Sequence, residues 1–138
     1  MTRINCGIPV RELTNQHLLA EHREIKRIPN TISSGKAVIK DIPSDFRLGT
    51  GHVKFFYDKL LYLKNRYIEI YDECVKREFN ITNYIEAWDD IPTNLMNDYS
   101  PTDYDREIVR ARIKERLEEA EAKAKAKSEA KRNDTIGK

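Results

Sequence analysis

The sequence predicts an all-α fold: a compact three-helix single domain with irregular connectors and a charged C-terminal tail that is helical or frayed. Helix-start and helix-stop residues frame a segment near the N-terminus. Apolar residues recur at helical spacing through the middle of the chain, and acidic residues open a third periodic segment. With 138 residues, the chain has the size of one domain.

The first helix is expected from about Thr14 to Ile28. Thr14 is of a residue type that caps helix N-termini, and Pro29 disfavours continuation of the helix beyond Ile28. The residues expected on the core face of this helix are Leu18, Leu19, His22 and Ile25. The helix is therefore predicted to pack one face inward and to leave the other for solvent or a partner.

The outer face of the same helix is polar. At about 100° per residue, Gln16, Arg23 and Arg27 fall within about 40° of one another, and Glu24 and His17 flank that stripe. One helix would therefore present two arginines, an amide and a carboxylate together. A glutamate between arginines is usually an ion-paired surface residue, so this pattern leaves both a structural and a catalytic role open.

A connector with prolines and glycines is expected from 29 to 51, followed by a second helix from about Val53 to Glu78. Its apolar residues recur at helical spacing: Val53, Phe56, Tyr57, Leu60, Leu63, Tyr67, Tyr71 and Cys74. This segment is predicted to be the central core helix. The stretch from Phe79 to Pro101 is expected to be mostly irregular.

The third helix is expected to begin near Thr102 or Asp103, with acids in its first turn where the helix dipole favours them. Its inward stripe is expected to consist of Val109, Ile113 and Leu117. Beyond Glu118 the chain is rich in Ala, Glu and Lys and has no large apolar residue until Ile136. That segment cannot bury a face, so it is either a solvated helix extension or a frayed tail.

Several conspicuous side chains are assigned structural roles. His22 lies on the expected inner face, and His52 is expected to begin a helix and make a structural hydrogen bond. Cys74 continues the apolar face of the second helix, which indicates a reduced core thiol rather than a metal ligand. Trp88 lies in an acidic segment and is expected to cover the core or a loop.

Charge is unevenly distributed along the chain, although the formal net charge is only +2. The segment from Thr2 to Lys40 is basic, the segment from Glu78 to Asp105 has seven acids and no Lys or Arg, and Arg106–Arg116 is basic again. Such segregation suits a nucleic-acid enzyme, and it also occurs by ordinary variation in soluble proteins. The first 30 residues have no apolar signal region, and no stretch reaches the ~18 apolar residues of a membrane span, so a cytoplasmic protein is expected.

The N-terminus itself offers a nucleophile. If Met1 is removed, the chain begins with a free amine on Thr2, whose pKa near ~7.7–8.0 leaves a usable unprotonated fraction at neutral pH. Glu24, with arginines around it, offers a general acid or base beside a phosphate-binding surface. A threonine after the initiator methionine is common, so the position has little meaning without its context.

That context is a series of ordered blocks over about residues 1–117. The blocks are Met1–Asn5, Glu12–Leu13, Gln16–Glu21, Arg23–Glu24, Arg27, Leu48–Val53, Phe55–Leu60, Glu73–Cys74, Phe79–Asn80, Asp90–Pro92, Asp98–Tyr99, Pro101, Arg110–Ile113 and Arg116–Leu117. In order and spacing they resemble the pyrimidine-dimer DNA glycosylase family. The resemblance implies a compact, all-helical enzyme that uses no metal and no cofactor.

The resemblance also implies a reaction and a set of site residues. Family members cut the glycosidic bond with the amine of the N-terminal threonine and then nick the strand by β-elimination, which assigns catalysis to Thr2 and Glu24. The implied DNA-binding residues are Arg3, Gln16, His17, Arg23, Arg27, Arg112 and Arg116. Residues 1–117 would be the glycosylase and abasic-site lyase domain, and residues 118–138 the charged tail.

The implied partner is double-stranded DNA with damaged pyrimidines or abasic sites, bound by a monomer in the cytoplasm of a bacterial or phage-infected cell, with no membrane involved. Two departures from the family pattern stand out. His22 replaces a tyrosine, and residues 118–138 contain no aromatic side chain, whereas a phage member ends in an aromatic-rich tail implicated in dimer recognition. Two alternatives therefore stay open: a related glycosylase or lyase for another lesion or modified base, and a non-catalytic DNA-binding protein on the same fold.

Overall fold

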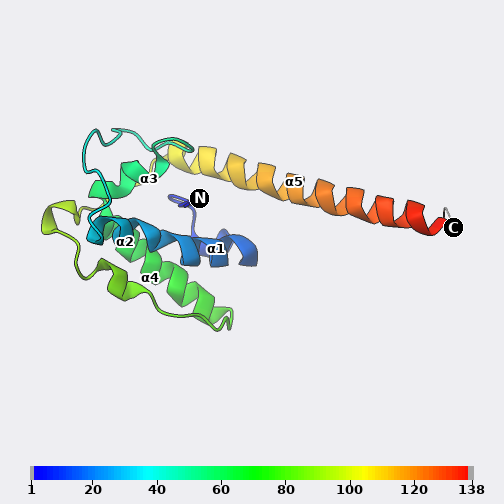
Figure 1. Cartoon of the computed structure of the whole chain (residues 1–138), viewed down its shortest axis with the longest axis horizontal. Coiled ribbons are helices and arrows are strands. Elements are labelled where there is room, and N and C mark those ends of the chain that lie inside the picture. The colour runs from blue at the N-terminus through cyan, green and yellow to red at the C-terminus, as the bar shows by residue number, and fades with distance from the viewer. Residues whose placement is uncertain (1, 137–138) are drawn as a thin grey trace.

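The computed structural model describes the backbone of residues 2–136 and the side chains of residues 2–130. Four helices in it have seven or more residues: α1 Asn15–Ile25, α2 Arg27–Ser33, α4 Leu60–Lys76 and α5 Asp103–Ile136 (Figure 1). The remaining elements are the short helix α3 His52–Phe55 and the 3-10 turns Val10–Glu12, Phe56–Asp58, Ile85–Trp88 and Thr93–Leu95. This described part of the chain has no strand, so the all-α prediction is confirmed, whereas the prediction of three helices is wrong.

The expected first helix is two helices. Thr14 is the N-cap of α1, and its hydroxyl oxygen accepts a hydrogen bond of 3.2 Å from the His17 N–H. The helix ends at Ile25, and a second helix then begins at Arg27 and continues through Pro29 to Ser33. Pro29 is compatible with helix here because it is the third residue of α2. A backbone N–H at that position has no acceptor within the helix, so the missing N–H of proline costs no hydrogen bond.

The expected second helix is also interrupted. Lys59, with φ of −128° and ψ of 41°, separates the α3 region from α4. The interruption leaves backbone groups without helical partners, and Asn97 provides partners for two of them. Its side-chain amide donates to the Asp58 carbonyl at 2.8 Å, and its backbone carbonyl accepts from the Tyr62 N–H at 3.2 Å. A residue 38 positions further along the chain than Lys59 therefore stabilises the break, which local sequence patterns do not show.

Helix α4 is the centre of the core, as predicted. It packs against α1 and buries the apolar stripe Leu60, Leu63, Tyr67, Ile70 and Cys74. Trp88 closes over Tyr67, with their ring centroids 5.2 Å apart, which confirms its placement in the core. The helix ends where Glu78 takes a φ of 65° and the Phe79 N–H bonds to the Cys74 carbonyl, a Schellman arrangement formed without glycine.

Helix α5 begins at the predicted place. The Thr102 hydroxyl accepts from the Asp105 N–H at 3.1 Å, and the Asp105 carboxylate accepts from the Thr102 N–H at 3.0 Å, so the two residues form a reciprocal cap. Val109 is fully buried and Ile113 packs partly against the core, but Leu117 is 40% exposed. The predicted inward stripe therefore ends one turn early.

Beyond that point α5 leaves the body of the molecule as a single straight rod (Figure 1). Every side chain from 114 to 130 is exposed, and the helix continues to Ile136. Of the two states expected for the charged tail, the structure shows the helix extension. Met1 and residues 137–138 lie outside the described part of the chain, as do the side chains of residues 131–136.

Cys6 and Cys74 are both free and fully buried, in keeping with the predicted core thiol. Burial raises the pKa of the Cys6 thiol to about 12, so this sulfur is held as an unreactive thiol. Among the described residues, none of the helices combines the length and apolar character that crossing a membrane requires.

Candidate active site

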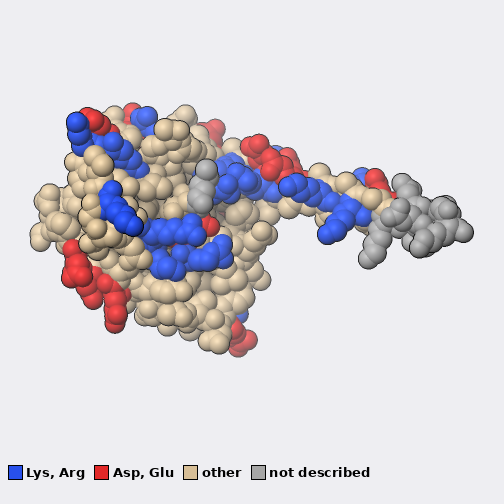
Figure 2. Space-filling view, in the orientation of Figure 1, with Lys and Arg blue, Asp and Glu red and all other residues tan. Residues whose placement is uncertain are grey.

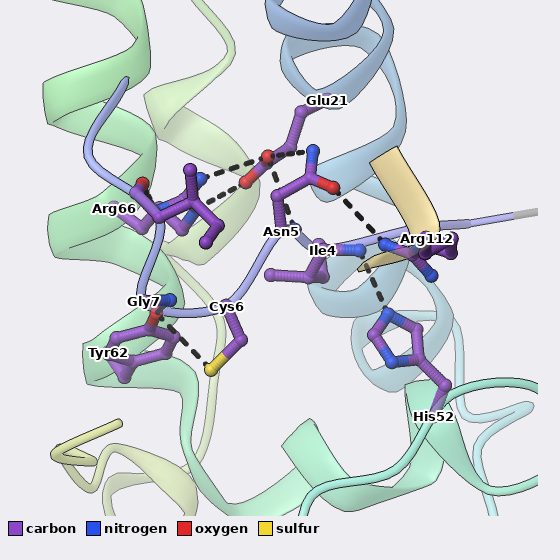
Figure 3. Close-up of polar contacts among 10 residues, drawn as sticks. Ile4, Asn5, Cys6, Gly7, Glu21, His52, Tyr62, Arg66 and Arg112 are labelled. Carbon is purple, nitrogen blue, oxygen red and sulfur yellow. Dashed lines mark hydrogen bonds and ion pairs between the residues drawn. The ribbon is translucent and has the colours of Figure 1, made fainter. Parts of the chain in front are cut away.

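The N-terminal segment, residues 2–8, is held in place by side chains that accept its backbone N–H groups. Its donors and acceptors pair as follows: Arg3 with Glu24 Oε1 at 3.0 Å, Ile4 with His52 Nε2 at 2.9 Å, Asn5 with Glu21 Oε1 at 3.3 Å, and Gly7 with the Tyr62 hydroxyl at 3.1 Å. Four acceptors from α1, α3 and α4 therefore replace the strand or helix partners that such a segment would otherwise need. Figure 3 shows the contacts of Ile4 with His52 and of Asn5 with Glu21.

His52 is one of these acceptors, and its protonation state follows from its contacts. Its Nε2 accepts the Ile4 N–H, so the ring hydrogen is on Nδ1, which donates to the Arg47 carbonyl at 2.9 Å. Burial lowers the pKa of His52 to about 4, and the ring is therefore neutral at physiological pH. The predicted structural role of His52 at the start of a helix is confirmed, as is the packing of His22, which is 4% exposed.

A buried ion pair between Glu21 and Arg66 fixes the next residue of the segment (Figure 3). The Arg66 Nε and Nη2 atoms both donate to the Glu21 carboxylate, and Nη1 donates to the Ile8 carbonyl at 3.0 Å. The Asn5 side-chain amide donates to Glu21 Oε1 at 2.8 Å. Both charges thus have partners in the interior, as a buried pair requires.

Glu21, Arg66 and Asn5 were not predicted as site residues. A signal for the first two exists: Glu21 falls on the α1 face between Leu18 and Ile25, and Arg66 falls at the matching place on α4. Opposite charges on the apolar faces of two helices that pack together indicate a buried ion pair. Asn5 gives no such signal, because its role depends on where the N-terminal segment lies.

Glu24 lies beside the start of the chain. Because its Oε1 accepts the Arg3 N–H, and three covalent bonds separate that nitrogen from the Thr2 nitrogen, the Thr2 nitrogen lies within about 4 Å of the Arg3 nitrogen. The other carboxylate oxygen of Glu24 is 3.7 Å from Arg23 Nη2. The Glu24 side chain is 13% exposed and the Arg23 side chain 63%, so the carboxylate is sheltered and its arginine neighbour faces solvent.

A small pocket of about 60 Å³ opens between the N-terminal segment, α1 and α5. Its lining residues are Arg3, Asn5, His17, Ala20, Glu21, Glu24, Arg112, Ile113 and Arg116. Arg112 reaches across from α5 and donates to the Asn5 side-chain oxygen at 3.1 Å, which ties α5 to the network of the N-terminal segment (Figure 3). The structure thereby brings residues from both ends of the chain into one wall.

The pocket is electropositive. Burial lowers the pKa of His17, and the charges of Arg112, Arg3 and Arg116 lower it further. Burial also lowers the pKa of Arg112, with the charge of Arg3 as the next cause. The imidazole is therefore neutral, and three guanidinium groups surround a pocket whose wall includes two carboxylates. Glu21 is neutralised by its buried ion pair with Arg66, whereas Glu24 is not paired in this way. This arrangement can attract an anion and place a carboxylate next to it.

Gln16, Arg23 and Arg27 do not line the pocket. They are exposed at its side, Gln16 and Arg23 on α1 and Arg27 at the first position of α2. The break at Lys26 means that the predicted stripe is not a single helix face. Figure 2 shows Lys and Arg side chains gathered around the N-terminal segment and continuing onto the near part of α5.

A family model described as pyrimidine dimer DNA glycosylase matches residues 1–87. The match contains the N-terminal segment and its acceptors on α1, α3 and α4, Glu24 among them. The chain belongs to the pyrimidine dimer DNA glycosylase family, a family of DNA repair enzymes, and its membership implies damaged DNA as the substrate. The match ends before α5, so it does not contain Arg112 or Arg116, which lie in the later blocks of the resemblance.

Proposed function

We propose that this protein is a DNA glycosylase with abasic-site lyase activity, which excises UV-induced pyrimidine dimers through an imine on the Thr2 amine. Residues 1–117 form the domain that carries both activities. The hydrogen bond of 3.0 Å between the Arg3 N–H and Glu24 Oε1 carries this proposal, because it holds the first residues of the chain against a sheltered carboxylate. The electropositive pocket beside them supports a phosphate-bearing substrate.

The first step needs a free amine. With Met1 removed, the Thr2 nitrogen attacks the anomeric carbon of the deoxyribose, and the damaged base leaves with the electron pair of its glycosidic bond and takes up a proton. Opening of the sugar ring then gives a protonated imine between the sugar and Thr2. The target carbon lies inside the duplex, so the DNA must bend or extrude a nucleotide to expose it.

Glu24 has two tasks in this scheme. Its carboxylate favours the position of the amine electrostatically before attack. After the imine forms, the hydrogens on the neighbouring sugar carbon become acidic, and Glu24 removes one of them while the bond to the 3′ phosphate breaks. The electrons of the broken C–H bond pass into a new double bond conjugated with the imine. The protonated imine is the electron sink, so the scheme uses no metal and no cofactor.

The arginines bind the phosphates of the DNA backbone. Arg3, Arg112 and Arg116 surround the pocket, while Arg23, Arg27 and Gln16 extend the same basic surface along α1 and α2. His17, held neutral, can donate or accept a hydrogen bond without adding charge. Because guanidinium groups bind phosphates with a fixed, forked geometry, these residues position the backbone on either side of the lesion rather than read bases.

A related substrate is the second candidate, and one observation favours it. The α5 extension has no aromatic side chain among residues 118–138, and its described side chains are exposed. Stacking on an aromatic ring is worth ~1–3 kcal/mol per base, so its absence is expected to cost one to two decades of lesion selectivity. Another damaged or modified base then competes with the pyrimidine dimer as the preferred target.

Incision of defined duplexes tests the proposal. Three duplexes of one sequence, with a cyclobutane pyrimidine dimer, an abasic site or neither, are mixed with excess enzyme in single-turnover reactions. We expect cleavage of the dimer and abasic duplexes, with a modest preference for the dimer, and no cleavage of the undamaged control. Efficient abasic cleavage without dimer incision would assign the protein to another lesion. Binding without incision of either would contradict an enzyme.

A further inference from the structure

The free part of α5, residues 114–130, is a surface that the proposed reaction leaves without a role. It is one continuous helix with Arg112 and Arg116, which line the pocket, and all its side chains are exposed. A rod without an apolar face gains nothing from packing. The sequence places Glu119 and Lys123, and likewise Glu121 and Lys125, at i, i+4 in the order that favours an isolated helix.

The charges on this rod are not symmetric around its axis. At about 100° per residue, the side chains of Arg112, Arg116, Lys123 and Lys127 fall within about 60° of one another. We call these four residues the basic stripe. Glu119 lies on the same face, and Glu115 lies at its edge. The opposite face has as many acids as bases: Arg110, Lys114 and Lys125 with Glu118, Glu121 and Glu129.

The direction of the basic stripe is fixed by its first member. Arg112 points at the N-terminal network, where it donates to Asn5 Oδ1 at 3.1 Å, and Arg116 lines the same pocket. Because α5 is unbroken to Ile136, Lys123 and Lys127 face the same side as these two residues. Figure 1 shows that no other described element lies beside this part of the helix. The basic stripe therefore runs from the pocket out into open solvent.

We infer that the free part of α5 is a second DNA-contact surface, which follows the phosphate backbone of undamaged duplex to one side of the lesion through Lys123 and Lys127. This inference rests on the proposed function, because the pocket must sit on DNA for the basic stripe to meet the same duplex. Arg112 and Lys127 are 15 residues apart. At 1.5 Å per residue the basic stripe extends about 22 Å, the length of about six to seven base pairs.

This surface would bind without reading sequence. Lysines on flexible stems contact phosphates as point charges, and each phosphate they neutralise releases counterions and makes affinity depend on salt. The surface would thereby lengthen the time the protein spends near one site and give the enzyme a one-sided footprint. The opposite face, with its balanced charges, would stay in solvent.

Paired charge-removing variants test this. Lys123→Gln with Lys127→Gln removes two charges from the basic stripe, and Lys114→Gln with Lys125→Gln removes two from the opposite face. Glutamine keeps the helix because its propensity is close to that of lysine. Affinity for an undamaged duplex of about 30 base pairs is measured over a series of salt concentrations, with circular dichroism as the check on helix content.

The stripe variant is expected to reduce the slope of log affinity against log salt by about 1.8, since each lost contact removes about 0.9. The opposite-face variant should leave the slope nearly unchanged, and Lys123→Arg with Lys127→Arg should retain the wild-type slope. Equal slopes in all variants, or equal losses in both glutamine pairs, would overturn the inference. Failure of the proposed function appears separately, as absence of incision by the wild-type protein on damaged duplexes.

Discussion

The backbone N–H of Arg3 donates a hydrogen bond of 3.0 Å to Oε1 of Glu24, 21 residues further along the chain. This contact joins the first residues of the protein to the second-last residue of α1. It places the proposed nucleophile, Thr2, and the proposed base, Glu24, side by side without requiring that Thr2 be buried. Thr2 is half-buried and the Glu24 side chain is 13% exposed, so the carboxylate is sheltered while the start of the chain stays accessible.

Replacement of Glu24 by glutamine separates chemistry from binding. The amide oxygen can still accept the Arg3 N–H, but the side chain can no longer take a proton. Strand cleavage should fall by ~10²-fold or more, the scale of general acid–base contributions. Affinity for DNA should stay the same or rise, because a negative charge leaves the basic surface. Single-turnover incision and fluorescence anisotropy measure the two effects.

Glu86→Gln is the matched control for that variant, since Glu86 is an exposed acid outside the pocket. Its incision rate should equal that of the wild type. A Glu24→Gln enzyme with near-normal turnover would reduce Glu24 to an ion-pair partner of Arg23 and an anchor for the N-terminal segment.

The buried pair of Glu21 and Arg66 is predicted to matter for stability far more than surface pairs do. Removing one partner, as in Arg66→Met, leaves an uncompensated buried charge and should cost about 3–5 kcal/mol of unfolding free energy. The exposed pair of Arg110 and Glu12 is the comparison, and Glu12→Gln should cost less than about 1 kcal/mol. Urea denaturation measures both, and equal costs would contradict the buried role of Glu21.

Stability is expected to fall as the pH is lowered from about 6.5 to about 4. Burial depresses the pKa of His52 in the folded state to about 4, against an ordinary value of 6.5, so the unfolded chain binds the extra proton first. The stability that neutral His52 contributes is fully present above pH 6.5 and is lost as the pH falls from about 6.5 to about 4. The loss in unfolding free energy is at most about 3 kcal/mol. Lower pKa values at His17 and His22 add to it with the same sign.

Chemical denaturation at a series of pH values measures this dependence. His52→Gln should flatten the slope between pH 6.5 and 4 and leave only the part from the other two histidines. If the variant kept the full wild-type slope, His52 would take up its proton at the same pH in the folded and the unfolded chain. The hydrogen bond that its Nε2 accepts from the Ile4 N–H argues against this.

Arg112 is predicted to contact a phosphate. Arg112→Gln should reduce the salt slope of DNA affinity by about 0.9 and leave the preference between dimer and abasic duplexes unchanged. Arg110→Gln, on the opposite face of α5, is the control and should change the slope little. If the two variants behave alike, the pocket side of α5 does not face the DNA.

Elements that depend on local patterns were predictable from the sequence. The cap at Thr14, the start of α5 after Thr102 and the apolar stripe of α4 need only neighbouring residues. The wrong predictions of helix bounds arose where contacts with distant residues determine the structure. The break before α4 is supported by Asn97, and Pro29 fits into α2 because a new helix begins two residues before it.

The candidate site shows the same division. Sequence spacing and resemblance nominated Arg3, His17, Glu24, Arg112 and Arg116, and the structure brings these five into the wall of one pocket. Of the side chains that hold the N-terminal segment, Glu21 and Tyr62 were not predicted to do so. Asn5 connects to both Glu21 and Arg112, and such a link exists only once α1, α4 and α5 are packed together.

Trapping of the covalent intermediate tests the central claim most directly. Wild-type protein is mixed with abasic-site DNA and borohydride, which reduces an imine to a stable amine link, and the adduct is located by peptide mapping. Intact mass spectrometry gives the fraction of protein that lacks Met1. We predict an adduct on the nitrogen of Thr2, with a trapped fraction no larger than the fraction without Met1. An adduct on Lys26 or any other lysine, or full trapping of protein that retains Met1, would contradict the account.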